Sequence, residues 1–186
     1  MKKILIILVV LLLTGCSANY NINFTEKSIE ESIEIYENSA IVNKYKDKEV
    51  NEANTVILDW EEGYDYYKRE LYTTEDITGY RYTYNFAYDE YDAMAQLRKC
   101  YENFNFKYDN KITLETSPYF LCADYYPKTK EIVINITSEY EITSSNADKV
   151  SNNTHTWIIN ENNYKKKPIK ITIDKNKKST NSEKKK

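Results

Sequence analysis

Glycine and histidine are scarce in this chain. Its 186 residues contain three glycines and one histidine. Three glycines cannot supply the glycine-rich loop that cradles a phosphate group. A Ser-His-Asp or Cys-His arrangement would depend on His155 alone, and no serine lies in a Gly-x-Ser-x-Gly turn. His155 alternates with Thr154 and Thr156, as expected of a half-exposed strand residue. We therefore expect no catalytic residues and no enzymatic activity.

Metal ligands are also few. The three cysteines lack the cysteine or histidine companions of a metal site. Acidic pairs such as Glu30 and Glu31 are frequent among 29 acidic residues, and none fits the Asp-x-Asp-x-Asp-Gly pattern of a calcium loop. We expect no metal and no cofactor. An enzyme that uses clustered carboxylates is the alternative that these pairs leave open.

A hydrophobic run long enough to cross a membrane is absent. The longest apolar run, Ile4 to Leu13, has ten residues and follows Lys2 and Lys3. A transmembrane helix needs about 20 apolar residues. A basic start, a short apolar run and small residues after it are typical of a secretory signal peptide. We expect residues 1–15 to be this signal and residues 16–174 to form a single extracytoplasmic domain.

The end of this segment, Leu13-Thr14-Gly15-Cys16, resembles the lipobox of bacterial lipoproteins. The resemblance implies cleavage before Cys16 and a covalent diacylglycerol and fatty acyl (palmitate) anchor on that cysteine. The protein would then lie on the extracytoplasmic face of the cell membrane, held by the lipid. An ordinary signal peptide followed by a chance cysteine is the alternative.

The charge distribution divides the chain into an acidic body and a basic end. Residues 175–186 hold six lysines and one glutamate, and residues 16–174 hold 18 basic and 28 acidic residues, a net charge of −10. An acidic body argues against nucleic acid as a partner, because phosphate contacts need clustered Lys and Arg. We expect residues 175–186 to be a disordered, solvated tail. Contact of the tail with an anionic membrane or wall polymer is the alternative.

Two cysteines remain besides Cys16. Cys100 and Cys122 are an even pair in a chain that we expect to be exported, where disulfides persist. A bridge between them would close a loop of 23 residues. We expect this disulfide; two separate buried thiols are the alternative.

The clearest alternation in the sequence is aromatic. Tyr80, Tyr82, Tyr84, Phe86 and Tyr88 recur with a period of two, which places them on one face of a strand. A core face beneath a helix is one interpretation. A ligand-binding groove lined by the four tyrosines is the other.

The order of the remaining patterns predicts an α+β fold. We expect one principal helix over residues 89–104, begun by Asp89 or Asp92, packed on a mainly antiparallel sheet. Its apolar stripe would place Cys100 on the buried side. A short helix is expected around Val56 to Leu58. Further strands are expected at residues 20–24, 33–35, 66–72, 112–114, 120–122, 132–136, 154–159 and 169–173.

The segment from Ser145 to Trp157, with the sequence SNADKVSNNTHTW, resembles the ending of small LppM-like lipoproteins and related membrane-anchored bacterial proteins. The Cys100 and Cys122 pair also resembles a pair in lipoproteins of low-GC Gram-positive bacteria. The resemblance implies an extracytoplasmic α+β domain without catalytic residues, with lipid or envelope binding in some relatives. From the residues, Asn146 to Asn153 is a polar turn and Trp157 anchors the next strand in the core.

These observations favour a non-catalytic surface lipoprotein that binds an envelope lipid, glycan or protein. The alternative is a structural or assembly subunit of an envelope complex, whose acidic face docks a basic partner.

Overall fold

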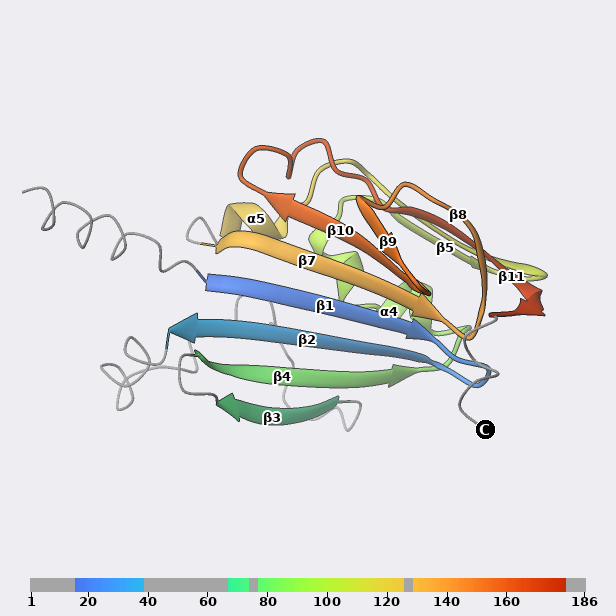
Figure 1. Ribbon diagram of the computed structural model, residues 1–186, viewed down its shortest axis with the longest axis horizontal. Helices are drawn as coiled ribbons and strands as arrows, with labels where there is room; N and C mark the ends of the chain where they lie inside the picture. Colours follow the sequence, from blue (N-terminus) through green and yellow to red (C-terminus); the bar gives the residue numbers. More distant parts are fainter. Residues whose placement is uncertain (1–15, 39–66, 74–76, 126–128, 180–186) are drawn as a thin grey trace, which may run out of the picture.

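The computed structural model describes residues 16–38, 67–73, 77–125 and 129–179. They form two β-sheets, one of seven strands in the order β3-β4-β2-β1-β7-β10-β9 and one of four in the order β5-β6-β11-β8 (Figure 1). The strands of the larger sheet are β1 Cys16–Phe24, β2 Ile29–Asn38, β3 Tyr67–Thr73, β4 Ile77–Phe86, β7 Thr129–Ser138, β9 Lys149–Ser151 and β10 Thr154–Asn160. The strands of the smaller sheet are β5 Phe104–Tyr108, β6 Lys111–Thr116, β8 Tyr140–Ser145 and β11 Lys170–Lys178.

Period-two alternation directs one face of each sheet into a shared core. In the larger sheet Ile22 pairs with Ile136 of β7, and both side chains are buried. In the smaller sheet Leu114 pairs with Ile171 of β11, and both are again buried. The pairing of β1 with β7 is parallel, and the other described strand pairs are antiparallel. The core is therefore closed by strands that are distant in the sequence.

The fold is mainly β, and the prediction of an α+β fold with a principal helix over residues 89–104 was wrong. In its place lie a four-residue helix α4, Tyr91–Met94, and a four-residue 3-10 helix η1, Leu97–Cys100. Ala95 separates them with an extended backbone, φ −53° and ψ 132°. The residues of the predicted apolar stripe from Leu97 onward are nevertheless buried, and Cys100 is on the buried side as predicted.

Tertiary hydrogen bonds explain why the helix stops. A continuous helix would bond the N–H groups of Gln96 and Leu97 to carbonyls one turn earlier. Instead the buried carboxylate of Glu31 on β2 accepts both N–H groups at 2.8 Å. Asp92, which the sequence suggests as a cap, accepts the N–H of Phe106 on β5 at 3.1 Å. Contacts with distant strands thus override the local helical pattern.

Of the other predictions from the sequence, some were confirmed and some were wrong. The alternating segments at β1, β2, β3, β4, β6, β7, β10 and β11 are strands, as predicted. The predicted strand at residues 120–122 is instead an isolated bridge from Phe120 to Tyr101, followed by one helical turn, α5, Cys122–Tyr125. Strands β5, β8 and β9 were not predicted. The boundary expected at residue 174 falls inside β11, and the helix expected around Val56 lies outside the described residues.

The two ends of the larger sheet carry different connections. Cys16, the first residue of β1, pairs with Thr129, and Asn160 at the end of β10 pairs with Glu131. The loop after β10 and the turn α5 before β7 therefore lie at the Cys16 end (Figure 1). At the opposite end the N–H of Glu139 donates to Phe24 and the N–H of Ser179 donates to Glu139. The chain enters and leaves its described part at opposite ends of the sheet.

Candidate functional site

Tyr82 and Tyr84 of β4, and Tyr88 just after it, belong to the core. Tyr82, Tyr84 and Tyr88 are 4%, 1% and 7% exposed, and Tyr84 stacks on Phe86 with ring centroids 5.7 Å apart. The side chain of Tyr80 lies outside the described part of the structure. The structure thus gives the core interpretation for three of the four tyrosines. Ligand binding by this face stays a prediction, and it would require the two sheets to separate.

Glu31 is the single acidic side chain in the described part of this core. It is fully buried and lies on β2 between Ile22 of β1 and Tyr84 of β4. Burial raises the pKa of its carboxyl to about 7, although the N–H groups of Gln96 and Leu97 and the charge of Lys99 oppose the shift. Its two carboxyl oxygens connect β2 of the larger sheet to the start of η1 through hydrogen bonds. Sequence reasoning named Glu31 as part of an acidic pair only, although its alternation with Ile29 and Ile33 was a signal that it lies on the apolar face.

Tyr91 lies in the same environment as Glu31. Burial, and then the charge of Glu31, raise the pKa of its phenol. Its ring contacts Phe106 edge-on with centroids 4.9 Å apart, and its hydroxyl has no hydrogen-bond partner among the described residues. Both side chains are fully buried in the core, where Glu31 connects β2 to η1.

The outer face of the larger sheet is polar and carries an ordered array of side chains. Asn135 donates to the Oδ1 of Asn21 at 3.0 Å, and Asn21 donates to the Oγ of Ser32 at 3.3 Å. Thr156 donates to the Oδ1 of Asn135 at 2.8 Å. This row crosses the four adjacent strands β2, β1, β7 and β10. We refer to Ser32, Asn21, Asn135 and Thr156 as the amide row.

A second row runs parallel to the amide row, one step further along the strands. Thr137 donates to the Oδ1 of Asn23 at 3.0 Å, and Asn23 donates to Glu30 at 3.1 Å. Beyond the other side of the amide row, the Nε of Arg81 donates to Glu34 at 2.7 Å. The side chains hold one another in place through these bonds, so the face is preorganised.

An open groove of about 470 Å³ lies on this outer face. Most of its lining residues have amide, hydroxyl or charged side chains, whose carbon atoms also contribute apolar surface. The lining residues are Asn21, Ile22, Asn23, Glu30, Glu31, Ser32, Arg81, Thr83, Asn135, Thr137 and Thr154. Sequence reasoning missed this groove. The alternation of polar residues opposite the apolar ones was the available signal, but it does not show which rows line up across strands.

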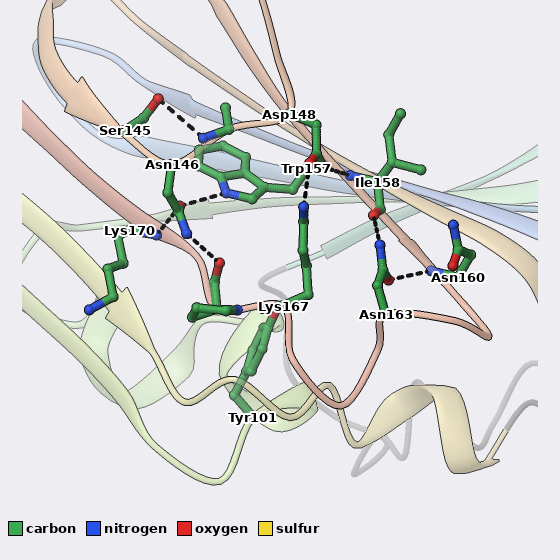
Figure 2. A network of polar contacts seen from close by, with 12 residues as sticks. Tyr101, Ser145, Asn146, Asp148, Trp157, Ile158, Asn160, Asn163, Lys167 and Lys170 are labelled. Atoms are coloured by element: carbon green, nitrogen blue, oxygen red, sulfur yellow. Dashed lines mark hydrogen bonds and ion pairs between the residues drawn. The ribbon is translucent and has the colours of Figure 1, made fainter.

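The segment that resembles LppM-like proteins forms a polar staple between the two sheets (Figure 2). The Oδ1 of Asn146 accepts the indole N–H of Trp157 and the backbone N–H of Lys170, both at 2.8 Å. Asp148 accepts the N–H of Ile158 at 2.7 Å and pairs with Lys167. Trp157 is fully buried, as predicted. The segment contains β9 within the expected turn and fixes β10 to β11.

His155 lies within hydrogen-bond distance of a serine. Its Nδ1 is 2.6 Å from the Oγ of Ser145, and burial lowers the pKa of the imidazole. In the Ser-His-Asp arrangement an acidic group orients the histidine from its other nitrogen. Among the contacts of the described residues no acidic group does so for His155. The pair joins β8 to β10 and thus links the two sheets.

Cys100 and Cys122 form a disulfide, as predicted, with their Cα atoms 4.8 Å apart. The bridge fixes α5 to η1, next to the N–H of Leu121, which donates to the carbonyl of Cys100 at 2.8 Å. Within residues 16–38, 67–73, 77–125 and 129–179, no group of three or more His, Cys, Asp or Glu side chains is arranged to hold a metal ion. No helix in those residues has the length and apolar character to span a membrane.

The sheets and the bridge define a mainly β, disulfide-linked domain of two sheets with one polar outer face. Among solved structures, this fold is similar to the NMR structure of the folded domain of LppM from Mycobacterium tuberculosis. The TM-score is 0.56, and the match covers 91% of this chain and 95% of that one at 11% sequence identity. At this identity the likeness concerns the fold alone. No protein-family model and no curated protein sequence matches the chain.

Proposed function

We propose that this chain is a lipid-anchored, extracytoplasmic protein that binds an envelope glycan on the outer face of its larger sheet, without catalysis. The observation that carries the proposal is the amide row, whose side chains are held by one another beside an open groove. Preorganised amides and hydroxyls match the hydroxyl groups of a sugar, which both donate and accept hydrogen bonds. Fixing these side chains beforehand lowers the entropy lost on binding.

Three observations support the anchor and the compartment. The first 16 residues have the pattern of a lipoprotein signal that ends at Cys16. The Cys100–Cys122 disulfide is typical of exported proteins. The fold is similar to that of the LppM folded domain, and the Ser145 to Trp157 segment resembles LppM-like lipoproteins.

A polar ligand fits the groove better than a lipid chain does. The aromatic side chains that would contact a lipid tail, such as Tyr84 and Phe86, are buried in the packed core. The described residues that line the groove include no aromatic ring. Binding would therefore depend on hydrogen bonds in an open groove, and we expect weak affinity for a single site. Repeated units of a polymer would raise it through avidity.

Nuclear magnetic resonance titration of residues 16–186 carrying Cys16→Ser, with soluble peptidoglycan fragments, tests this proposal. We expect shifts of amide signals in β1, β7 and β10 around the amide row. Asn135→Ala should weaken the shifts, because it removes the central member of that row. Asn85→Ala is the matched control, since Asn85 is exposed on the same face of β4.

The absence of any shift with glycan fragments would contradict glycan binding. Shifts confined to the Tyr82 to Phe86 region on addition of short-chain lipid would instead favour the lipid interpretation.

A further inference from the structure

The position of Cys16 leaves no spacer between the proposed lipid and the folded domain. This inference rests on the proposed lipid anchor. Cys16 is the first residue of β1, a strand in the interior of the larger sheet, and it pairs with Thr129 of β7. A lipid on this residue would hold the Cys16 end of the sheet within a residue or two of the bilayer surface. The surface of the domain at that end therefore decides how it meets the membrane.

Residues 118–125 and 160–167 contribute to the described surface there, and backbone hydrogen bonds connect the two segments. The N–H of Phe120 donates to the carbonyl of Tyr164 at 2.7 Å, and the N–H of Lys167 donates to Pro118 at 2.7 Å. The rings of Tyr119 and Tyr164 lie 5.8 Å apart. The ammonium of Lys165 lies 5.4 Å from the ring centroid of Tyr164 and 6.0 Å from that of Tyr119. The disulfide at Cys122 holds the first segment in place.

Lys165 and Lys166 differ from several other lysines in the last part of the described chain. Lys165 and Lys166 are exposed, and neither has an ion pair within the part of the chain that the structure describes. By contrast, Lys167, Lys170 and Lys178 pair with Asp148, Glu115 and Glu26.

The opposite end of the sheet carries several acidic residues, together with Lys27 and with Lys178, which pairs with Glu26. Glu26 and Glu139 meet there, since the N–H of Glu26 donates to the Glu139 carboxylate at 2.8 Å. Asp89 and Glu90 follow Tyr88, whose hydroxyl donates to the carbonyl of Thr25 in the same region.

We infer that Tyr119, Tyr164, Lys165 and Lys166 form a membrane-docking rim that rests on the anionic headgroups around the Cys16 lipid. Tyrosine has an apolar ring and a polar tip, and is enriched where hydrocarbon meets water. Lysines near an anionic surface add attraction that falls off within a Debye length. Residues 16–174 have a net charge of −10, and Asp124, Glu131 and Glu161 are exposed at this end, so the two lysines supply the attraction that such a surface requires.

Docking by the rim would stand the strands upright on the membrane. On β1, the amide row includes Asn21 and the second row includes Asn23. These residues lie five and seven positions beyond Cys16, which corresponds to about 16–23 Å along an extended strand. The groove would then open sideways, above the headgroups and toward the wall. Lys178 and Ser179 would lie at the far end, away from the bilayer.

Amine footprinting of the lipidated protein tests the rim. The full-length chain is expressed in a bacterium with its own N-terminal segment, purified from membranes and placed in phosphatidylcholine nanodiscs with or without phosphatidylglycerol. Acetylation of each lysine by a water-soluble reagent is then read by mass spectrometry. We expect Lys165 and Lys166 to be protected in the anionic discs, while Lys27, exposed at the opposite end, is labelled equally in both.

Charge reversal provides the second measurement. The double variant Lys165→Glu/Lys166→Glu should lose rim contact, which we read from spin-labelled headgroups as reduced relaxation of amides in residues 161–167. Each lysine should contribute about fivefold to the preference for the docked orientation. Lys27→Glu is the matched control and should leave the relaxation unchanged.

The outcomes separate the two proposals. Absence of a lipid mass on Cys16 would contradict the proposed anchor itself. A lipidated protein with equal labelling of Lys165, Lys166 and Lys27 in both kinds of disc would overturn the rim alone. Protection of Lys27 in place of the rim lysines would overturn it as well.

Discussion

The two faces of the larger sheet are built from the same strands and differ in almost every physical respect. On β2, Glu30 and Glu31 are neighbours in sequence with the same side-chain chemistry. Glu30 faces outward and accepts a hydrogen bond from Asn23 at 3.1 Å. Glu31 faces inward, is fully buried and has a pKa raised to about 7 by that burial. Alternation along a strand places adjacent residues in water and in the core.

The two faces accommodate polar groups in different ways. Among the described residues the inner face holds one carboxyl, and the cost of burying it is offset by the hydrogen bonds from two backbone N–H groups. The outer face distributes many weaker bonds between half-exposed side chains, each replaceable by water. We therefore expect substitutions on the inner face to change stability and those on the outer face to change binding.

The largest effect is expected from removing the buried carboxyl. Glu31→Ala would leave the N–H groups of Gln96 and Leu97 buried without an acceptor and would open a cavity. We expect the free energy of unfolding to fall by about 4 kcal/mol. Urea denaturation measures it, with Glu30→Ala as the matched control, for which we expect a change within about 0.5 kcal/mol. Equal effects of the two variants would show that the faces do not differ as described.

The stability of the protein should depend on the titration of Glu31. Between pH 4.5, its ordinary pKa, and about pH 7 only the folded state retains the proton. The free energy of unfolding should therefore fall as the pH rises through this window, by on the order of 3 kcal/mol in total. Above about pH 7 Glu31 should cause no further change. Denaturation at several pH values measures it, as the difference from Glu31→Gln, which has no titrating group. A constant difference from pH 4 to 8 would contradict the raised pKa.

The Cys100–Cys122 disulfide links η1 to α5 in the core and should stabilise the folded state. Replacing Cys100 and Cys122 by alanine together should lower the free energy of unfolding by about 3 kcal/mol in the chain-entropy model for a loop of this size. Thermal denaturation of the oxidised protein and the double variant measures it. The shifts caused by glycan fragments on the outer face should be unchanged in the folded variant. Loss of those shifts would show that the two faces are coupled.

The staple between the sheets should have an intermediate effect. Asn146→Ala removes the acceptor of the buried Trp157 indole and of the Lys170 N–H. We expect a loss of about 2 kcal/mol. Asn162→Ala, at an exposed position in the loop after β10, is the control. Unfolding followed by tryptophan fluorescence reports on both, and a variant as stable as its control would exclude the staple as a stabilising element.

The smallest effect on stability is expected at the amide row. Asn135→Ala removes bonds to Asn21 and Thr156, which are only partly buried. We expect a change of about 1 kcal/mol or less in urea denaturation, because water replaces the lost partners. A loss as large as that of Glu31→Ala would mean that the row serves folding, which would weaken its assignment as a binding surface.

Local patterns were sufficient to predict those elements that contacts with distant segments do not disrupt. The alternation around Tyr82 and Ile134 predicts strands because a period of two needs no knowledge of the partner strand. The pairing of Cys100 with Cys122 was predicted because compartment and an even count restrict the choice. The prediction of a helix over residues 89–104 failed because Glu31, distant in the sequence, binds the N–H groups of Gln96 and Leu97 where the backbone is extended at Ala95.

The candidate site was less predictable than the fold. Asn21 and Asn135 are 114 residues apart in the sequence and 3.0 Å apart as donor and acceptor. Their contact depends on the parallel pairing of β1 with β7 and on its register. The same holds for the rim, where Tyr119 and Tyr164 meet only because β7 and β10 begin and end at one edge.

The sequence by itself determined the alternation of the strands, the acidic body, the signal-like segment ending at Cys16 and the candidate disulfide, because each depends on composition or on residues close in the chain. The tertiary structure alone decided that the buried Glu31 binds the start of η1, that Tyr82 and Tyr84 are core, and that a polar row crosses four strands. The reason is physical: burial and register arise from pairing between distant segments, and adjacent residues in a strand have opposite environments only once the sheet has found its partner.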